Sequence, residues 1–213
     1  MRFGHFDDAR REYVITTPQT PLPWINYLGS EDFFSLVSNT AGGYSFYRDA
    51  RMRRLTRYRY NSSPLDMDGH HIYIKDGGTV WNPGWQPTKT PLDRYSCRHG
   101  LGYTILEGEK DGICAAQELF VPKGDACELD RLTLTNRSDR PRELDVFGYV
   151  EFRRVRLCGV LPVGCCRRQH QLPAQLLHRR GGGGAVCHLP QDRVPGAPRS
   201  LRGVLVQHPG HQL

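Results

Sequence analysis

The composition of this 213-residue chain changes abruptly after Phe152, and this break limits what the chain can fold into. All 21 Phe, Trp and Tyr residues lie in the first 152 positions. The 61 residues that follow contain none of them, and they also lack Ile, Lys, Glu, Asn, Thr and Met. Such a segment has little apolar surface to offset the roughly 1–2 kcal/mol of backbone entropy lost per ordered residue. We therefore expect residues 1–152 to fold and residues 153–213 to form a disordered or non-native tail.

The positive charge of the chain is concentrated in the same tail. Residues 153–213 carry ten Arg and one acidic residue, Asp192, so their net charge is +9, whereas residues 1–152 carry −2. A total of +7 would ordinarily indicate a polyanionic partner such as nucleic acid. Basic arms of that kind are usually rich in Lys and Ser, however, and this tail is rich in Arg, Gly, Pro, Cys and Leu. That bias is typical of GC-rich DNA translated in the wrong frame.

The genetic code supports a frameshift at the composition break. Permitted codons for Asp145–Phe152, preceded by one extra C and read again, spell Arg-Arg-Val-Arg-Leu-Cys-Gly-Val, which reproduces all eight residues from Arg153 to Val160. From Gln169 onward the offset frame permits S-T-N-F-Q-R-N-F-S-I-G-E-V-E-V, which contains aromatic residues and alternates as strands do. We therefore predict a short tandem duplication with one extra base, which shifts the frame of everything downstream.

Residues 1–152 show the pattern of an all-β protein. Short apolar or alternating runs rich in Val, Ile, Tyr, Phe and Thr are separated by Gly, Asn and Pro turns, and no paired helix start and stop signals occur. The expected strands are Tyr13–Thr16, Trp24–Leu28, Phe33–Ser38, Gly43–Tyr47, Leu55–Tyr60, His71–Lys75, Thr79–Trp81, Tyr95–Leu101, Tyr103–Glu107, Ile113–Val121, Leu129–Thr135 and Leu144–Phe152. Many strands at this spacing predict an antiparallel β-sandwich. The last two, joined by a polar connection, are expected to pair as a hairpin.

The region lacks several well-known chemical motifs. It has no Gly-rich phosphate loop, no Cys-x-x-Cys, no His-Glu-x-x-His and no Gly-x-Ser-x-Gly. We interpret the pair His70-His71 as part of a solvated loop rather than as a metal site. The three cysteines before the break are expected to be reduced thiols in a cytoplasmic protein, because the charged start carries no secretory signal. No apolar run is long enough to span a membrane.

Two clusters of residues are candidates for binding. The first runs from Tyr44 to Tyr60 and interleaves six Arg with Tyr. It fits a nucleic-acid surface, a strand pair whose Arg residues pair with acids elsewhere, or a sugar or phosphate pocket. The second cluster contains Trp81 and Trp85 between Pro and Gly residues. These two rings fit either a platform for pyranose rings or a lid packed over a sheet edge.

The blocks Pro23–Tyr47, Arg57–Asn61, Trp81–Pro87 and Arg98–Thr104 resemble the N-terminal region of cellobiose phosphorylases. The resemblance covers essentially all of residues 1–152. It implies the N-terminal β-supersandwich of a bacterial cytoplasmic enzyme that cleaves a β-1,4-linked glucose disaccharide with inorganic phosphate. The products would be α-glucose 1-phosphate and glucose, formed with inversion. Neither a metal nor an organic cofactor is implied.

In that family a helical barrel that follows the sandwich carries the general acid, so we expect this chain to be inactive alone and assign no catalytic residue. The family's sugar-binding segment is similar to the N-F-Q-R text, which lies out of frame. Because the family sandwich also contributes to a homodimer, Tyr44, Tyr47 and Arg53 are candidates for sugar or dimer contacts. The expected partners are a cellobiose-like disaccharide and a second copy, with neither nucleic acid nor membrane. The alternatives are a stand-alone carbohydrate-binding sandwich that uses Trp81 and Trp85, and a basic nucleic-acid-binding protein.

Overall fold

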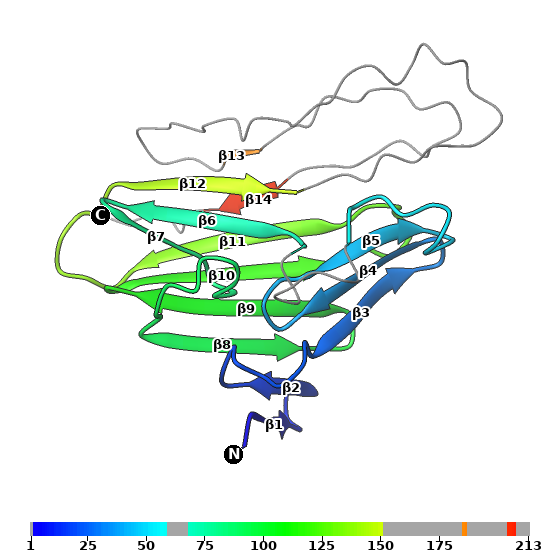
Figure 1. The fold of residues 1–213 in the computed structure, drawn as a ribbon, viewed down its shortest axis with the longest axis horizontal. Helices are drawn as coiled ribbons and strands as arrows, with labels where there is room; N and C mark the ends of the chain where they lie inside the picture. Colours follow the sequence, from blue (N-terminus) through cyan, green and yellow to red (C-terminus); the bar gives the residue numbers. More distant parts are fainter. Residues whose placement is uncertain (1, 59–67, 151–184, 187–203, 208–213) are drawn as a thin grey trace, which may run out of the picture.

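The computed structural model describes residues 2–58, 68–150, 185–186 and 204–207, and these residues form strands, turns and loops without any helix (Figure 1). The strands are β1 (Gly4–Asp7), β2 (Glu12–Ile15), β3 (Ile25–Ser30), β4 (Phe33–Ser38), β5 (Gly43–Tyr47), β6 (His71–Asp76), β7 (Thr79–Trp81), β8 (Arg94–His99), β9 (Tyr103–Lys110), β10 (Ile113–Phe120), β11 (Leu129–Asn136), β12 (Leu144–Tyr149), β13 (Ala185–Val186) and β14 (Val204–Gln207). The predicted all-β class is confirmed. No helix in the described part of the chain is long and apolar enough to cross a membrane.

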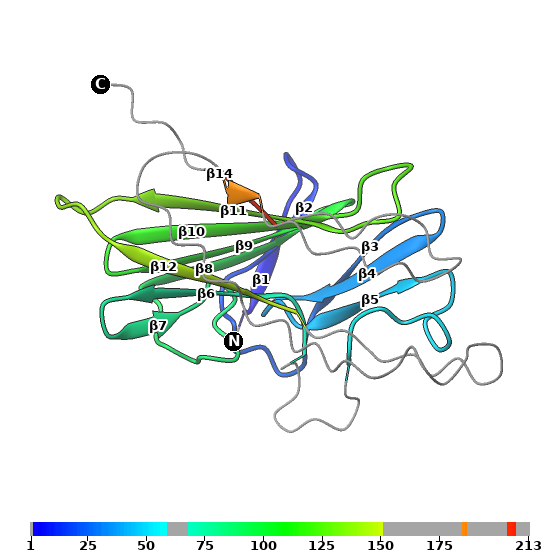
Figure 2. The same ribbon diagram turned by 90° about the horizontal axis from the view of Figure 1, so that it is seen from above.

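The strands build two layers (Figure 2). One layer is an eight-stranded sheet in the order β1-β2-β8-β9-β10-β11-β14-β13. The other layer consists of two three-stranded sheets, β12-β6-β7 and β3-β4-β5, which lie side by side and face the large sheet. All pairs are antiparallel except β14, which runs parallel to β11. The predicted sandwich of antiparallel sheets is therefore confirmed.

Alternation along the strands produces two apolar cores between the layers. In β10, for example, Ile113, Ala115 and Leu119 point inward and are at most 1% exposed, as expected for a sheet with one buried side. One core joins β3-β4-β5 to the large sheet, and the other joins β12-β6-β7 to it. The buried members of the first core are Ile15, Leu28, Val37, Ala41, Cys97, Leu106 and Leu119. Those of the second are Ile72, Ile74, Trp81, Ile113, Ala115, Leu132 and Leu134.

The predicted hairpin between the last two strands of residues 1–152 is wrong. Strand β11 pairs with β10, whereas β12 crosses to the other layer and pairs with β6 along Leu144–Tyr149. The reason is the second core, because Leu144 and Val146 pack against it from the layer opposite Leu132 and Leu134. A hairpin would have placed all four side chains in the same sheet.

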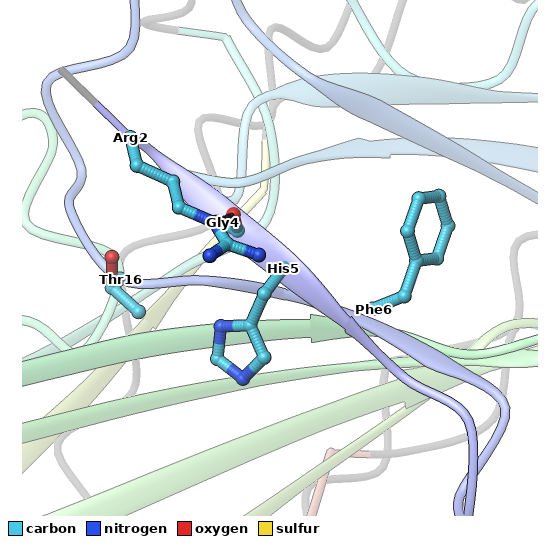
Figure 3. A pocket seen from close by; sticks show the side chains of 5 residues that line it. All are labelled: Arg2, Gly4, His5, Phe6 and Thr16. Atoms are coloured by element: carbon cyan, nitrogen blue, oxygen red, sulfur yellow. Dashed lines mark hydrogen bonds between the residues drawn. The ribbon is translucent and has the colours of Figure 1, made fainter.

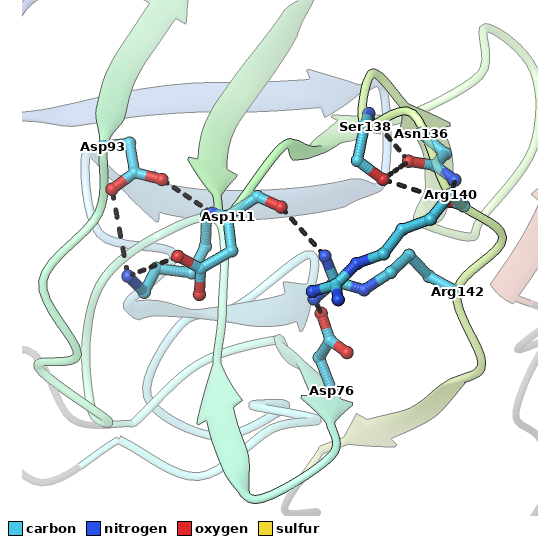
Figure 4. A network of polar contacts seen from close by, with 8 residues as sticks. Asp76, Asp93, Asp111, Asn136, Ser138, Arg140 and Arg142 are labelled. Atoms are coloured by element: carbon cyan, nitrogen blue, oxygen red, sulfur yellow. Dashed lines mark hydrogen bonds and ion pairs between the residues drawn. The ribbon is translucent and has the colours of Figure 1, made fainter.

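Polar contacts hold the connection that makes this crossing (Figure 4). Asn136 Oδ1 accepts a hydrogen bond from the backbone N–H of Ser138 at 2.9 Å, which turns the chain at the end of β11. Arg142 then donates to the carbonyl oxygen of Asp111 at 3.1 Å and to the carboxylate of Asp76. Because Asp111 belongs to the large sheet's β9–β10 turn and Asp76 ends β6, Arg142 ties the two layers together.

Residues 55–60 and the tail differ from the prediction or lie partly outside the described residues. The expected strand Leu55–Tyr60 is absent at residues 55–58, and its last two positions lie outside the described residues. Just before this segment Arg54 forms an isolated bridge with Phe46, and the backbone N–H groups of Leu55 and Thr56 donate to the carbonyl oxygen of Ser45. Of the tail, the structure describes β13 and β14, and β14 pairs with β11 along Asp130–Thr133. The prediction of low order elsewhere in residues 153–213 falls outside the described residues.

Candidate functional site

The outer side of the β3-β4-β5 sheet carries a continuous group of large apolar side chains. Cross-strand register places Tyr27, Leu36 and Tyr44 in one row and Phe34 beside Phe46 in the next. We call these five residues the aromatic face. The Phe34 and Phe46 rings are stacked with centroids 5.2 Å apart, and the Tyr44 ring lies 6.0 Å from that of Phe46. Tyr44, one of the predicted contact residues, therefore belongs to a surface cluster.

The structure separates Tyr44 from Tyr47 instead of bringing them together. Three residues apart on β5, they point to opposite sides of the sheet, because strand side chains alternate. Tyr47 lies at the end of β5, where its hydroxyl donates a hydrogen bond to Asp32 Oδ2 at 3.3 Å. Arg48 holds the same carboxylate at 2.7 Å and extends over the Tyr47 ring at 5.1 Å. Tyr47 is therefore part of an ion-pair corner, and Tyr44 is not.

Electrostatics at this corner follow from the ion pair. The hydrogen bond from Arg48 lowers the pKa of Asp32, and the Asp32 carboxylate in turn raises the pKa of Arg48. Next to the pair, the backbone N–H groups of Met52 and Arg51 lower the pKa of Asp49 by donating to it. Arg48 is thus engaged by an acid, as the interpretation of paired arginines expects.

Of the two adjacent arginines, Arg54 rather than Arg53 contacts the aromatic face. The Arg53 side chain is exposed, and its backbone N–H and C=O bond to Asp49 and Tyr47. Arg54 is 6% exposed, and its guanidinium carbon lies 4.5 Å above the centroid of the Tyr44 ring. A guanidinium at this distance makes a cation–π contact. Arg54 therefore packs against Tyr44 at the edge of the aromatic face.

The two tryptophans of the second cluster have different environments. Trp81 is 0% exposed and fills the second core, so its ring offers no surface to a sugar. Trp85 is partly buried in the loop after β7, where its φ of 69° lies in the left-handed region. Its carbonyl oxygen accepts hydrogen bonds from Lys89 N at 2.7 Å and Thr88 Oγ1 at 3.2 Å. Of these two tryptophans, only Trp85 is partly exposed.

A buried polar cluster joins the β3-β4-β5 sheet, the large sheet and the loop that leads into β6, and the sequence did not predict it. Ser45 Oγ donates to Glu128 Oε2 at 2.6 Å, and His70 Nδ1 lies 3.3 Å from Glu128 Oε1. Gln117 Nε2 donates to Asp130 Oδ2 at 2.9 Å and to the carbonyl oxygen of His70 at 3.1 Å. We call Ser45, His70, Gln117, Glu128 and Asp130 the polar junction.

The polar junction contains an unusual acid. Burial raises the pKa of Asp130 to about 8, with a further contribution from the negative charge of Glu128. A carboxyl that keeps its proton at neutral pH has the property of a general acid. Asp130 Oδ1, however, has no solvent contact and no hydrogen-bond partner. With one carboxyl oxygen buried and the other bonded to Gln117, we assign Asp130 a structural role.

The histidine pair at the polar junction corrects another expectation. We interpreted His70-His71 as part of a solvated loop, yet the His70 side chain is 13% exposed and His71 is 1% exposed. The described residues hold no group of three or more His, Cys, Asp or Glu side chains that could bind a metal ion. One sequence signal for the junction existed, because Gln117 occupies an inward position of β10 between Ala115 and Leu119.

A surface hollow of about 310 Å³ lies at the N-terminal hairpin, away from every predicted site residue. Arg2, Gly4, His5, Phe6 and Thr16 line it, and Figure 3 shows His5 and Phe6 projecting to opposite sides of β1. Arg2 Nε donates to the carbonyl oxygen of Gly4 at 3.2 Å, and Thr16 Oγ1 donates to that of Phe3 at 3.2 Å. Arg2 and Thr16 thus form hydrogen bonds within the N-terminal hairpin.

Fold and surface together define a two-layered β-sandwich domain with an aromatic outer face. Residues 11–155 match the family described as glycosyl hydrolase 94, supersandwich domain, and the chain belongs to this family. Over 156 residues it is 46% identical to N,N'-diacetylchitobiose phosphorylase from Vibrio furnissii and 44% identical to the enzyme of that name from Vibrio proteolyticus. Over 153 residues it is 42% identical to solabiose phosphorylase from Paenibacillus borealis.

These similarities cover 70–71% of this chain but 19–20% of the relatives. The chain therefore spans about a fifth of the length of the relatives it matches. The relatives are disaccharide phosphorylases, which agrees with the resemblance found in the sequence, although they are named for disaccharides other than cellobiose.

Proposed function

We propose that this chain is the N-terminal part of a disaccharide phosphorylase and that its residues after Phe152 are translated in a shifted frame. The match to the family ends at residue 155, three positions after the last aromatic residue. This coincidence carries the proposal, because composition and family similarity are lost at the same place. The eight residues that repeat in an offset frame supply a mechanism for the loss.

In the frame-restored, full-length protein, inorganic phosphate attacks the anomeric carbon of a β-linked disaccharide while a carboxylic acid protonates the glycosidic oxygen. The products are an α-sugar 1-phosphate and a free sugar. None of the described residues is assigned to this chemistry. Cellobiose is the disaccharide that the sequence resemblance implies. The names of the relatives favour N,N'-diacetylchitobiose instead, so it is our first choice of substrate.

Within this scheme Tyr47, Arg53 and Trp85 remain candidates for contact with sugar or with a second copy in a homodimer. Tyr44, as a member of the aromatic face, is instead a candidate for contact with the rest of the full-length chain. Their surface or border positions on the β3-β4-β5 layer and the loop after β7 support these roles. Trp81 is not carried forward, because it belongs to the core. Location in the cytoplasm also remains a prediction.

The test compares the 213-residue chain with the frame-restored full-length protein. Each is incubated with phosphate and either N,N'-diacetylchitobiose, cellobiose or solabiose, and sugar 1-phosphate is measured. We expect phosphate-dependent product from the full-length protein and none from the 213-residue chain. Failure of the full-length protein on all three disaccharides, while it is folded, would contradict the proposed function. Product from the 213-residue chain would contradict the assignment of catalysis to the missing part.

A further inference from the structure

The two outward sides of the sandwich differ in chemistry. The large sheet presents charged side chains that pair across its strands: Arg98 lies 3.4 Å from Glu107, and Arg131 contacts Glu118. Further along the same side, Arg137 Nη1 forms an ion pair with Glu109 Oε2 at 3.1 Å. Charges arranged in this way keep a sheet surface solvated. This side of the sandwich needs no cover.

The opposite layer presents the aromatic face. Tyr27 is 66% exposed, and the other four members are partly exposed. Ile25 extends the apolar surface along β3 at 47% exposure. The Phe34 ring lies over Gly29 of the neighbouring strand, where an added Cβ would meet Phe34 Cδ1 at 2.4 Å. Contiguous apolar surface of this kind marks interaction sites.

The apolar surface continues onto the neighbouring β12-β6-β7 sheet. Ile72 and Ile74 fill the core, so Tyr73 between them points outward, as does its cross-strand partner Phe147. Tyr149, 45% exposed, packs edge-on against Tyr73 with centroids 6.5 Å apart. Aromatic residues are the residue type most enriched at protein interfaces. Two adjacent sheets thus present aromatic side chains in the same direction.

We propose that the aromatic face is a docking surface for the polypeptide that follows β12 in the frame-restored full-length protein; this inference rests on the proposed function. The position where β12 ends supports it. Tyr149 pairs with His71, and two residues before His71, Gly69 bridges to Gly42 at the start of β5. Strand β12 therefore ends between the two small sheets, beside the aromatic face (Figure 2).

The length and character of the missing polypeptide also fit. The relatives are about five times longer than the matched region, so most of their chain lies outside it. The offset-frame text after Gln169 alternates apolar and polar residues and contains Phe, Ile and Val, as a strand or loop packed on an apolar sheet does. The shifted tail that replaces it here has no aromatic residue. The aromatic face then loses its natural cover in the 213-residue chain.

Cysteine labelling tests this proposal. Tyr27→Cys is introduced into both the 213-residue chain and the frame-restored protein, and the rate of reaction with a maleimide is measured after subtraction of the parent's own thiols. We expect labelling at least about 100-fold slower in the full-length protein, because a covered site reacts through local opening. Leu101→Cys, at a turn residue that is 86% exposed, is the matched control and should react within about twofold of the same rate in both.

Several outcomes would overturn the proposal. Equal labelling of Tyr27→Cys in the two proteins shows an open face, and protection that disappears on dilution assigns the cover to a second copy. Ile25→Cys provides a second probe on the same strand if the first variant does not fold. The phosphorolysis assay on the same preparation separates the two claims. An active but unprotected protein refutes docking alone, whereas a protected but inactive protein refutes the proposed activity alone.

Discussion

Replacing Asp130 with Asn should stabilise the folded chain at neutral and alkaline pH. Burial raises the pKa of Asp130 to about 8 from the usual 3.8, so the folded state keeps a proton that the unfolded state releases. The substitution preserves the shape of the side chain and removes the group that folding holds in its neutral form. Gln117 keeps an oxygen to donate to, because the Asn amide retains a carbonyl.

The sign and size of the effect follow from proton linkage. Between about pH 4 and pH 8 the folded state binds more protons than the unfolded state, so the Asp130 contribution to the free energy of unfolding falls as pH rises, by at most about 1.4 kcal/mol per pH unit. That contribution is fully present below the unfolded pKa and is lost as pH approaches about 8. From pH 5 to pH 7 the upper limit is about 3 kcal/mol. Because Asp130 as a residue is partly exposed, we expect about 1–2 kcal/mol.

Urea unfolding, followed by tryptophan fluorescence, measures the effect at pH 5, 6, 7 and 8. The stability of Asp130→Asn relative to the parent should increase steadily with pH. Asp125→Asn, at an exposed position at the same end of the large sheet, is the matched control for the loss of one carboxylate. A difference between Asp130→Asn and the parent that stays constant from pH 5 to pH 8 would refute a buried neutral carboxyl at the polar junction.

Three other substitutions test the connection between β11 and β12, the start of β5, and the ion-pair corner around Tyr47. Arg142→Ala removes a guanidinium, 13% exposed, that joins Asp76 to the large sheet, and should cost about 1–3 kcal/mol in urea unfolding; an unchanged midpoint would show that the crossing does not depend on it. Gly43→Ala should cost at least about 2 kcal/mol, since φ is +139° and a Cβ would lie 1.8 Å from the Leu36 carbonyl oxygen; a loss below about 0.5 kcal/mol would contradict this geometry. In the frame-restored protein, Tyr47→Ala should raise the KM for the disaccharide about tenfold, a loss of about 1.4 kcal/mol of binding, and unchanged kinetics would count against a sugar contact.

Strand positions could be predicted because burial on one side of a sheet imposes alternation on the sequence. Phe33–Ser38 and Gly43–Tyr47 were predicted with the bounds that the structure shows. Strand partners were harder to predict. A polar connection after β11 is compatible with a hairpin and with a crossing between layers, and the choice depends on which core Leu144 and Val146 complete. That choice involves residues on β6 that are about 70 positions away in the sequence.

In the candidate site, too, alternation along a strand could be predicted from the sequence, whereas contacts between distant residues could not. Tyr44 and Tyr47 look adjacent in the sequence, yet alternation on β5 sends them to opposite sides, and this could have been read from their spacing of three. The contact of Arg54, rather than Arg53, with the Tyr44 ring could not have been predicted, because it depends on how the turn after Asp49 orients each side chain. The polar junction draws Ser45 from one small sheet, Gln117 and Asp130 from the large sheet, and His70 and Glu128 from the loops before β6 and β11. In the sequence, Gln117 at an inward position was its single visible sign.

Nucleotide sequencing of the gene across codons 145–161 tests the central claim most directly. A shifted frame predicts that the bases encoding Asp145–Phe152 are repeated immediately downstream, one base out of register, and that the original frame continues beyond the repeat as an open sequence similar to the relatives. A sequence in which codons 153–160 bear no such relation to codons 145–152 would contradict the claim. The tail would then belong to the protein, and its charge of +9 would need a partner of its own.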